Sequence, residues 1–179
     1  MDAIEKNFRD TPIDSKKYAK RLTIFIDYLV KNGKLLEAKY YFKKLSDKKP
    51  NHEKTIRLGY SLSIATFDND GVRKFDKLLY DSKPKDVEIF WFRLKYYLSV
   101  NNHKDCEECC EFLLSKRIEI KYLNTIIEAC LNLKNYNIAI TLIKYLEKEK
   151  LTLNSFGMQH IKKLALERLV ISIVKVKCG

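Results

Sequence analysis

Apolar residues recur along the chain at three- and four-residue intervals, the spacing of helices that bury one face. The first stripe contains Tyr18, Leu22, Phe25, Ile26 and Leu29. The second contains Leu35, Ala38, Tyr41, Phe42 and Leu45. A break at Asn32-Gly33 separates the two stripes, and Pro50 ends the second one. The pattern predicts two helices joined by a short turn.

The same two-helix arrangement recurs three more times along the chain. The second copy has a helix near residues 55–67 and a break at residues 68–71. The third copy breaks at residues 101–103 and the fourth at residues 134–135. Equivalent positions in the second helix of each copy hold Ala38, Phe75, Cys106 and Ala139. They lie about 31 to 37 residues apart, which is the period of a two-helix repeat.

This repetition predicts an all-α fold. We expect residues 17–153 to form a right-handed α-solenoid of about four antiparallel helix pairs. The chain contains only 5 Gly and 3 Pro, fewer than the many turns of a sandwich or barrel would need. Residues 1–16 carry no apolar run and are expected to be an N-terminal extension.

The C-terminal segment, residues 154–179, is expected to contain a capping helix and a tail. Asn154 or Ser155 is suited to begin this helix. Its apolar positions are Met158, Ile161, Leu164, Ala165 and Leu169. A solenoid needs its last repeat covered, and this helix would cover it. The apolar run at residues 169–174 leaves two alternatives open: contact with a partner or a second copy of the chain, and continuation into a longer protein.

The first helix pair, residues 19–52, resembles a tetratricopeptide repeat. The matching positions are the turn glycine Gly33, the small Ala38, the aromatic Phe42 and the closing Pro50. A small residue lets the two helices approach, and an aromatic ring fills the groove beside them. The resemblance extends in part to residue 153. Phe75 stands where a small residue is expected, whereas Cys106 and Ala139 restore it.

The tetratricopeptide resemblance implies that the first helix of each pair lines a concave face that binds an extended peptide or a partner's helix. The matching positions are Lys20, Thr23, Asp27 and Lys31, then Ile56 and Tyr60, then Trp91 and Lys95, then Lys121, Asn124 and Glu128. The alternative is that these are ordinary exposed residues, and for Trp91 that it belongs to the core. Members of the family that grip chaperone tails have Lys and Asn where Thr23 and Asp27 stand, so such a tail is not the expected ligand.

Residues 120–154 also resemble a pentatricopeptide repeat. The matching positions are Tyr122, Asn124, Thr125, Ile127 and Ala139. In that family the residues that match Asn124 and Asn154 read one RNA base. This second resemblance implies an alternative function, an RNA-binding helical-repeat protein that uses a basic surface.

The formal net charge of +12 is large for 179 residues and sets up a positive surface potential. An acidic segment of a partner protein, RNA and an anionic membrane surface are all suited to it, and a lysine-rich composition without a binding role is the alternative. No stretch is apolar enough to cross a bilayer. Five cysteines, an odd number, and the absence of a signal peptide favour the cytoplasm or the nucleus.

No catalytic motif stands out in the sequence. It has no glycine-rich phosphate loop, no His-Glu-x-x-His motif and no nucleophile elbow, and no cofactor is expected. His103 with Cys106, Cys109 and Cys110 raises the question of a zinc site. These cysteines also occupy positions where the repeat needs small apolar residues, which is the alternative interpretation. We therefore interpret the chain as a non-catalytic protein-interaction module or scaffold subunit.

Overall fold

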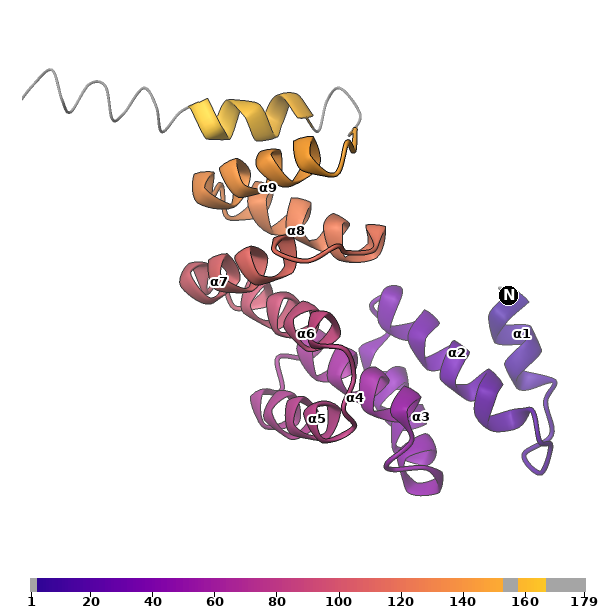
Figure 1. Ribbon diagram of the computed structural model, residues 1–179. Coiled ribbons are helices and arrows are strands. Elements are labelled where there is room, and N and C mark those ends of the chain that lie inside the picture. The colour runs from indigo at the N-terminus through magenta and orange to yellow at the C-terminus, as the bar shows by residue number, and fades with distance from the viewer. Residues whose placement is uncertain (1–2, 153–157, 167–179) are drawn as a thin grey trace, which may run out of the picture. The chain divides into compact units, whose positions relative to one another are not determined.

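The computed structural model describes residues 3–152 and 158–166, and every regular element within them is a helix (Figure 1). Neighbouring helices pack in pairs, so the prediction of an all-α, solenoid-like fold is confirmed. None of the helices in these residues is both long and apolar enough to span a membrane. The chain divides into two compact units, Met1–Lys85 and Asp86–Gly179, which are described in turn.

The first unit contains five helices within its described residues. They are α1 (Ala3–Arg9), α2 (Tyr18–Lys31), α3 (Leu35–Lys48), α4 (Glu53–Ala65) and α5 (Asn69–Asp81). α2 pairs with α3 and α4 pairs with α5, while α4 also packs against α2 and α3. The two first helices, α2 and α4, therefore lie next to each other, which is the arrangement that the repeat pattern predicts.

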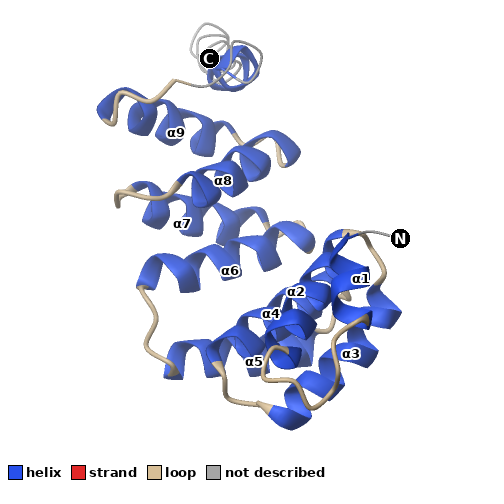
Figure 2. Cartoon of the chain, turned by 90° about the vertical axis from the view of Figure 1, so that its right-hand side faces the viewer, coloured by secondary structure: helices blue, strands red, loops and turns tan. Residues whose placement is uncertain are grey.

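The second unit repeats this arrangement. Its helices are α6 (Asp86–Ser99), α7 (His103–Leu114), α8 (Ile120–Asn132) and α9 (Tyr136–Lys148). α6 pairs with α7 and α8 with α9, and in addition α6 packs on α8 and α7 on α9 (Figure 2). First helices thus contact first helices, and second helices contact second helices.

One kind of turn joins the two helices of every pair. Its central residue has the left-handed backbone conformation, with φ of 70° at Gly33, 53° at Phe67, 53° at Asn101 and 48° at Lys134. The next N–H donates to the carbonyl five residues earlier, over N···O distances of 2.9 Å in the first three turns and 3.2 Å in the last. These are the features of the Schellman motif, which ends a helix by satisfying its last carbonyls. The turns recur at intervals of 34, 34 and 33 residues.

The residue after each left-handed turn immediately precedes the next helix. In three of the four turns its side chain caps that helix, because Asp68, Asn102 and Asn135 each accept a backbone N–H from the first turn of α5, α7 or α9. The same residue therefore ends one helix with its backbone N–H and begins the next with its side chain. This double role keeps the connections short and fixes the two helices as a pair.

Small residues let the paired helices approach. Ala38, Cys106 and Ala139 are all fully buried, as the repeat pattern predicts. In the second pair the small and the large residue are exchanged between the two helices. Gly59 on α4 is the small residue, and the ring of Phe75 on α5 lies over it. A methyl group added to Gly59 would stand 2.3 Å from the Cζ atom of Phe75. The small residue of this pair is therefore in its first helix.

Within the expected N-terminal extension, α1 forms a helix that is packed onto the first pair. Phe8 on α1 is 6% exposed and stacks on Phe25, with 4.6 Å between ring centroids. Its ring also meets Tyr18 and Tyr41. The guanidinium of Arg21 donates to the carbonyl of Asn7 and to the hydroxyl of Thr11, which holds the end of α1. α1 thus covers apolar surface on α2 and α3 that would otherwise face water.

A corresponding helix, residues 158–166, lies at the other end of the chain (Figure 1). Ile161 is fully buried, and Met158, Leu164 and Ala165 pack against the core formed by α6 to α9. The prediction of a capping helix is confirmed for these residues. The expected cap residues Asn154 and Ser155 and the apolar run at 169–174 lie outside the described residues.

We expect Lys134→Gly to stabilise the protein. An L-residue with positive φ is strained, and glycine relieves this strain while adding entropy to the unfolded chain, so the net gain should be about 0.5–1 kcal/mol. Lys144→Gly, an exposed site within α9, is the control and should lower stability by about 1 kcal/mol. Urea denaturation measures the free energy of unfolding of both variants. Equal destabilisation by the two would contradict the assignment of strain to the turn.

We expect Gly59→Ala to destabilise the protein by about 1–3 kcal/mol, because the new methyl group collides with the ring of Phe75. Phe75→Ala should also destabilise, by leaving a cavity. In the double variant the methyl group enters the space left by the ring, so its loss of stability should be smaller than the sum of the two single losses. Additive losses in thermal or urea unfolding would show that the two side chains do not share this space.

Candidate functional site

A hollow of about 250 Å³ lies where the start of α2, the end of α3 and the start of α4 meet. Its apolar floor includes Ala19, Ile24 and Leu45. Four lysines contribute to its lining, namely Lys16, Lys20, Lys49 and Lys54. The side chain of Ile24 is accessible, since this residue is 47% exposed. The hollow therefore combines accessible aliphatic surface with several cationic groups.

A second hollow of about 280 Å³ continues from the first along α2 and α4. The two share Thr23, Ile24 and Lys54, and the second one extends to Asp27 on α2 and to Arg57 on α4. Its remaining lining residues are Leu58 and Ser61. We call the two hollows together the α2–α4 groove. Because α2 and α4 are first helices of successive pairs, this groove occupies the face on which the repeat pattern predicts a binding surface.

The two ends of the α2–α4 groove differ in charge. No carboxylate lines the first hollow, and within the described part of the chain none of its four lysines forms an ion pair. In the second hollow, Asp27 pairs with Lys31 over 2.6 Å and Arg57 pairs with Glu53 over 2.9 Å. Positive charge is therefore concentrated at the end formed by the start of α2 and largely balanced at the other end.

Three of the residues predicted for the first repeat come together in this groove. Lys20, Thr23 and Asp27 line it, and Lys31 lies at its margin through the ion pair with Asp27. These four positions follow one face of α2, at intervals of three and four residues. The residues that the tetratricopeptide resemblance singles out on α2 therefore share one side of the groove, and their role in binding stays a prediction.

The predicted residues of the second repeat do not line the groove. Tyr60 is 1% exposed, and its hydroxyl donates to a carboxylate oxygen of Asp76 on α5 over 2.8 Å. Ile56 is buried as well, with 3% of its surface exposed. Both side chains lie inside the unit because Ile56 stands two residues after the groove-lining Lys54, and two residues turn a helix by about 200°.

The residues of α4 that do line the groove were missed. Lys54, Arg57 and Ser61 come 34 residues after Lys20, Thr23 and Asp27, respectively. The spacing of the Schellman turns, also 34 residues, is the signal that would have identified them. The apolar pattern of α4 alone does not identify these lining residues, because its apolar positions Ile56 and Tyr60 are buried.

In the second unit, Trp91 joins the two first helices α6 and α8. Its indole N–H donates to the hydroxyl of Thr125 over 2.8 Å, and its ring meets the ring of Tyr122 edge-on, with 5.4 Å between centroids. The ammonium of Lys95 lies 4.7 Å from the centre of the indole ring. Trp91 is half-buried, so it is both a packing residue and part of the predicted face.

The predicted residues of α8 are exposed. Lys121 pairs with Glu119 over 3.1 Å, and this hydrogen bond raises the pKa of the lysine, which stays charged. Asn124 and Glu128 point to solvent one and two turns further along the helix. Asn154, which the pentatricopeptide resemblance pairs with Asn124 for base reading, lies outside the described residues.

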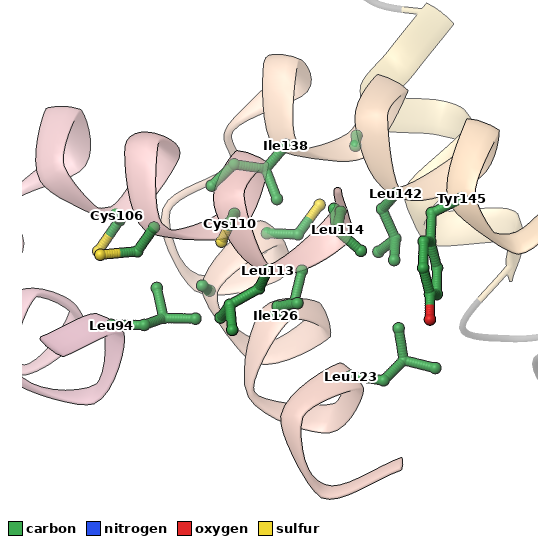
Figure 3. Packing of buried hydrophobic residues seen from close by; sticks show 14 of the residues in the cluster. Leu94, Cys106, Cys110, Leu113, Leu114, Leu123, Ile126, Ile138, Leu142 and Tyr145 are labelled. Atoms are coloured by element: carbon green, nitrogen blue, oxygen red, sulfur yellow. The ribbon is translucent and has the colours of Figure 1, made fainter. Parts of the chain in front are cut away.

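The cysteines of α7 are core residues. Cys106, Cys109 and Cys110, together with Cys130 on α8, are at most 4% exposed and carry free thiols. Figure 3 shows Cys106 and Cys110 among leucine and isoleucine side chains. In residues 3–152 and 158–166 no group of three or more His, Cys, Asp or Glu side chains is placed to hold a metal ion. The expectation that these cysteines pack as small apolar residues is confirmed.

Burial also changes the acidity of these thiols. It raises the pKa of Cys106 and Cys130 from an ordinary value of 9.0 to about 11, and that of Cys109 to about 12. The pKa of Cys110 is raised too, by burial and by the neighbouring thiols. The thiolate is the reactive form of cysteine. These thiols stay protonated near neutral pH and are therefore poor nucleophiles.

Comparison with known proteins returned no match: no protein-family model fits the sequence, and no curated protein or solved structure is significantly similar to the chain.

We expect the buried thiols to make the fold sensitive to alkali. The unfolded chain loses these protons above a pH of about 9 and the folded chain only above about 11, so stability is fully present below the first value and falls as pH rises between the two. The fall should be smaller in the variant Cys109→Ala, Cys130→Ala. Urea unfolding at several pH values in this range measures the free energy of unfolding. An equal fall in the native chain and the variant would contradict the assignment of the fall to the buried thiols.

Proposed function

We propose that this protein is a non-catalytic interaction module that binds a segment of a partner protein in the α2–α4 groove. The observation that supports this best is the convergence of Lys20, Thr23 and Asp27 with Lys54 and Arg57 around two adjoining hollows. Two adjoining hollows along α2 and α4, with an accessible isoleucine and a cationic margin, suit an extended peptide better than a small substrate. The apolar area drives association and the charges select the partner.

We further propose that the helix pairs are tetratricopeptide-like repeats. Three features support this assignment: the 34-residue interval between turns, the helix lengths of 12 to 14 residues in α2 to α9, and the buried small residues Ala38, Cys106 and Ala139. The exchange of sizes between Gly59 and Phe75 departs from the family's pattern in the second pair. The free thiols support a reducing location, the cytoplasm or the nucleus.

RNA binding is the second candidate function, and the charge of the chain favours it. Residues 1–85 contain 20 Lys and Arg residues against 12 Asp and Glu residues, so most of the net charge of +12 belongs to the first unit. A protein that holds RNA through phosphate contacts loses affinity steeply as salt is added. Exposed Asn124 on α8 is a further position suited to a base.

Affinity purification from native extract, with mass spectrometry, tests the proposal. We compare the native chain with the variant Lys20→Glu, Lys54→Glu and with the control Lys77→Glu, Lys85→Glu, whose exposed lysines belong to the same unit but not to the groove. Two charge reversals in the groove should reduce recovery of a specific partner about tenfold or more, because about 1.4 kcal/mol corresponds to a factor of ten. The control should recover it normally.

The outcomes separate the two candidate functions. A protein partner that survives RNase treatment and is lost only in the groove variant supports the interaction module. RNA binding is supported if the partners are lost after RNase treatment and if the groove variant and the control variant recover them to the same extent. A protein partner recovered equally well by all three chains contradicts the assignment of the groove as the binding site. Circular dichroism of each variant checks that it is folded.

A further inference from the structure

We infer that the α2–α4 groove selects an extended peptide in which acidic residues are grouped at one end and are followed by a branched aliphatic residue. This inference rests on the proposed function and specifies its ligand. The acidic group would occupy the first hollow, at the start of α2, and the aliphatic side chain would cover Ile24. Three observations carry the inference, namely the separation of charge along the groove, the position of Ile24, and the kinds of side chain that line the first hollow.

The separation of charge determines where acidic residues bind. Lys16, Lys20 and Lys49 line only the first hollow, while Lys54 lines both. Within the described residues these ammonium groups form no ion pair and no carboxylate lines the first hollow, so a run of ligand carboxylates would meet several cations at once. At the far end the charges of Asp27 and Arg57 are already offset by Lys31 and Glu53, so a further carboxylate there would gain much less. Acidic residues spread evenly along a peptide would place some of them beside Asp27.

The position of Ile24 determines where an apolar residue binds. Its side chain lines both hollows and is 47% exposed, although its neighbours Phe25 and Ile26 on α2 are fully buried. Leu45 and Leu58 lie below it in the first and second hollow, respectively. An aliphatic side chain placed over Ile24 would remove this surface from water, at about 25 cal/mol for each Å² of apolar area. The acidic run and the aliphatic residue must therefore be neighbours in the ligand.

The lining of the first hollow favours a peptide over single-stranded RNA. Proteins that hold single strands combine a positive groove with aromatic rings on which the bases stack. The only ring that lines the first hollow is the imidazole of His52, whose Nδ1 atom already accepts the backbone N–H of Lys54 over 3.2 Å. Ala19, Thr23 and Ile24 offer no flat surface for a base. Cationic and aliphatic groups without rings match carboxylates and a leucine or isoleucine side chain.

Fluorescence anisotropy with four labelled probes tests the inference on the full chain. The first probe is a peptide with a run of glutamates, then one leucine, then neutral residues. The second has the same composition with the glutamates spread evenly, and the third has serine in place of leucine. The fourth is oligouridylate. We expect the first probe to bind tightest and the second and third to bind about tenfold and about threefold more weakly, which corresponds to about 1.4 and 0.7 kcal/mol.

Variants locate the binding of the first probe. The change Lys16→Ala, Lys49→Ala removes two cations that only the first hollow contains, and it should weaken the first probe about tenfold while changing the second probe less. Ile24→Ser should abolish the advantage of leucine over serine. The control Lys77→Ala, Lys85→Ala has the same net charge as the lysine variant and should bind like the native chain. Thermal unfolding checks that each variant is folded.

The inference is overturned if the first two probes bind equally well, if the groove and control variants bind the first probe equally well, or if oligouridylate displaces it from the groove. These failures are distinct from failure of the proposed function. A partner whose recovery from extract depends on Lys20 and Lys54, combined with no binding of the acidic probes, would leave the groove as the binding site. It would refute only the acidic and aliphatic ligand inferred for it.

Discussion

The hydrogen bond that closes each helix pair is the interaction on which the rest of this structure depends. In each turn a residue with left-handed backbone reverses the chain, and the next N–H satisfies a carbonyl that the helix end would otherwise leave open. In three turns the same next residue then caps the following helix with its side chain. Because one short segment performs both tasks, the second helix has little freedom to leave the first. The pairs are also nearly equal in length, with turns 33 or 34 residues apart, and this places corresponding residues of successive pairs next to each other.

The α2–α4 groove is a direct result of that regularity. Lys20 and Lys54, like Thr23 and Arg57, are equivalent positions of successive pairs, and they face one another because their helices are neighbours. No loop or insertion is needed to form the groove. Its chemistry depends on the side chains that the repeated positions carry, and in the second unit these are different. There the equivalent residue is Trp91, whose ring and N–H fill the space between α6 and α8.

Much of the fold could be predicted from sequence because apolar spacing, turn glycines and small residues all point to the same helix pairs. The parts that could not be predicted have specific physical causes. α1 is seven residues long and buries only one large side chain, Phe8, so it has too short an apolar pattern to recognise. Tyr60 was assigned to the groove by carrying over repeat positions into a first helix of uncertain length, whereas the structure buries its ring and its hydroxyl donates to Asp76. The ion pairs of the groove, Asp27 with Lys31 and Glu53 with Arg57, each lie within one helix, but which side chains line the two hollows depends on contacts between helices.

The pattern of helix contacts also has a consequence for how the chain acquires its structure. Each helix touches only helices that are one or two positions away in the sequence, as with α2 and α4 or α7 and α9. Contacts of this kind close short loops, which favours rapid folding. The aromatic cluster around Phe8 is an example, because its rings come from the neighbouring helices α1, α2 and α3 alone. Its assembly therefore requires no contact with a distant part of the chain.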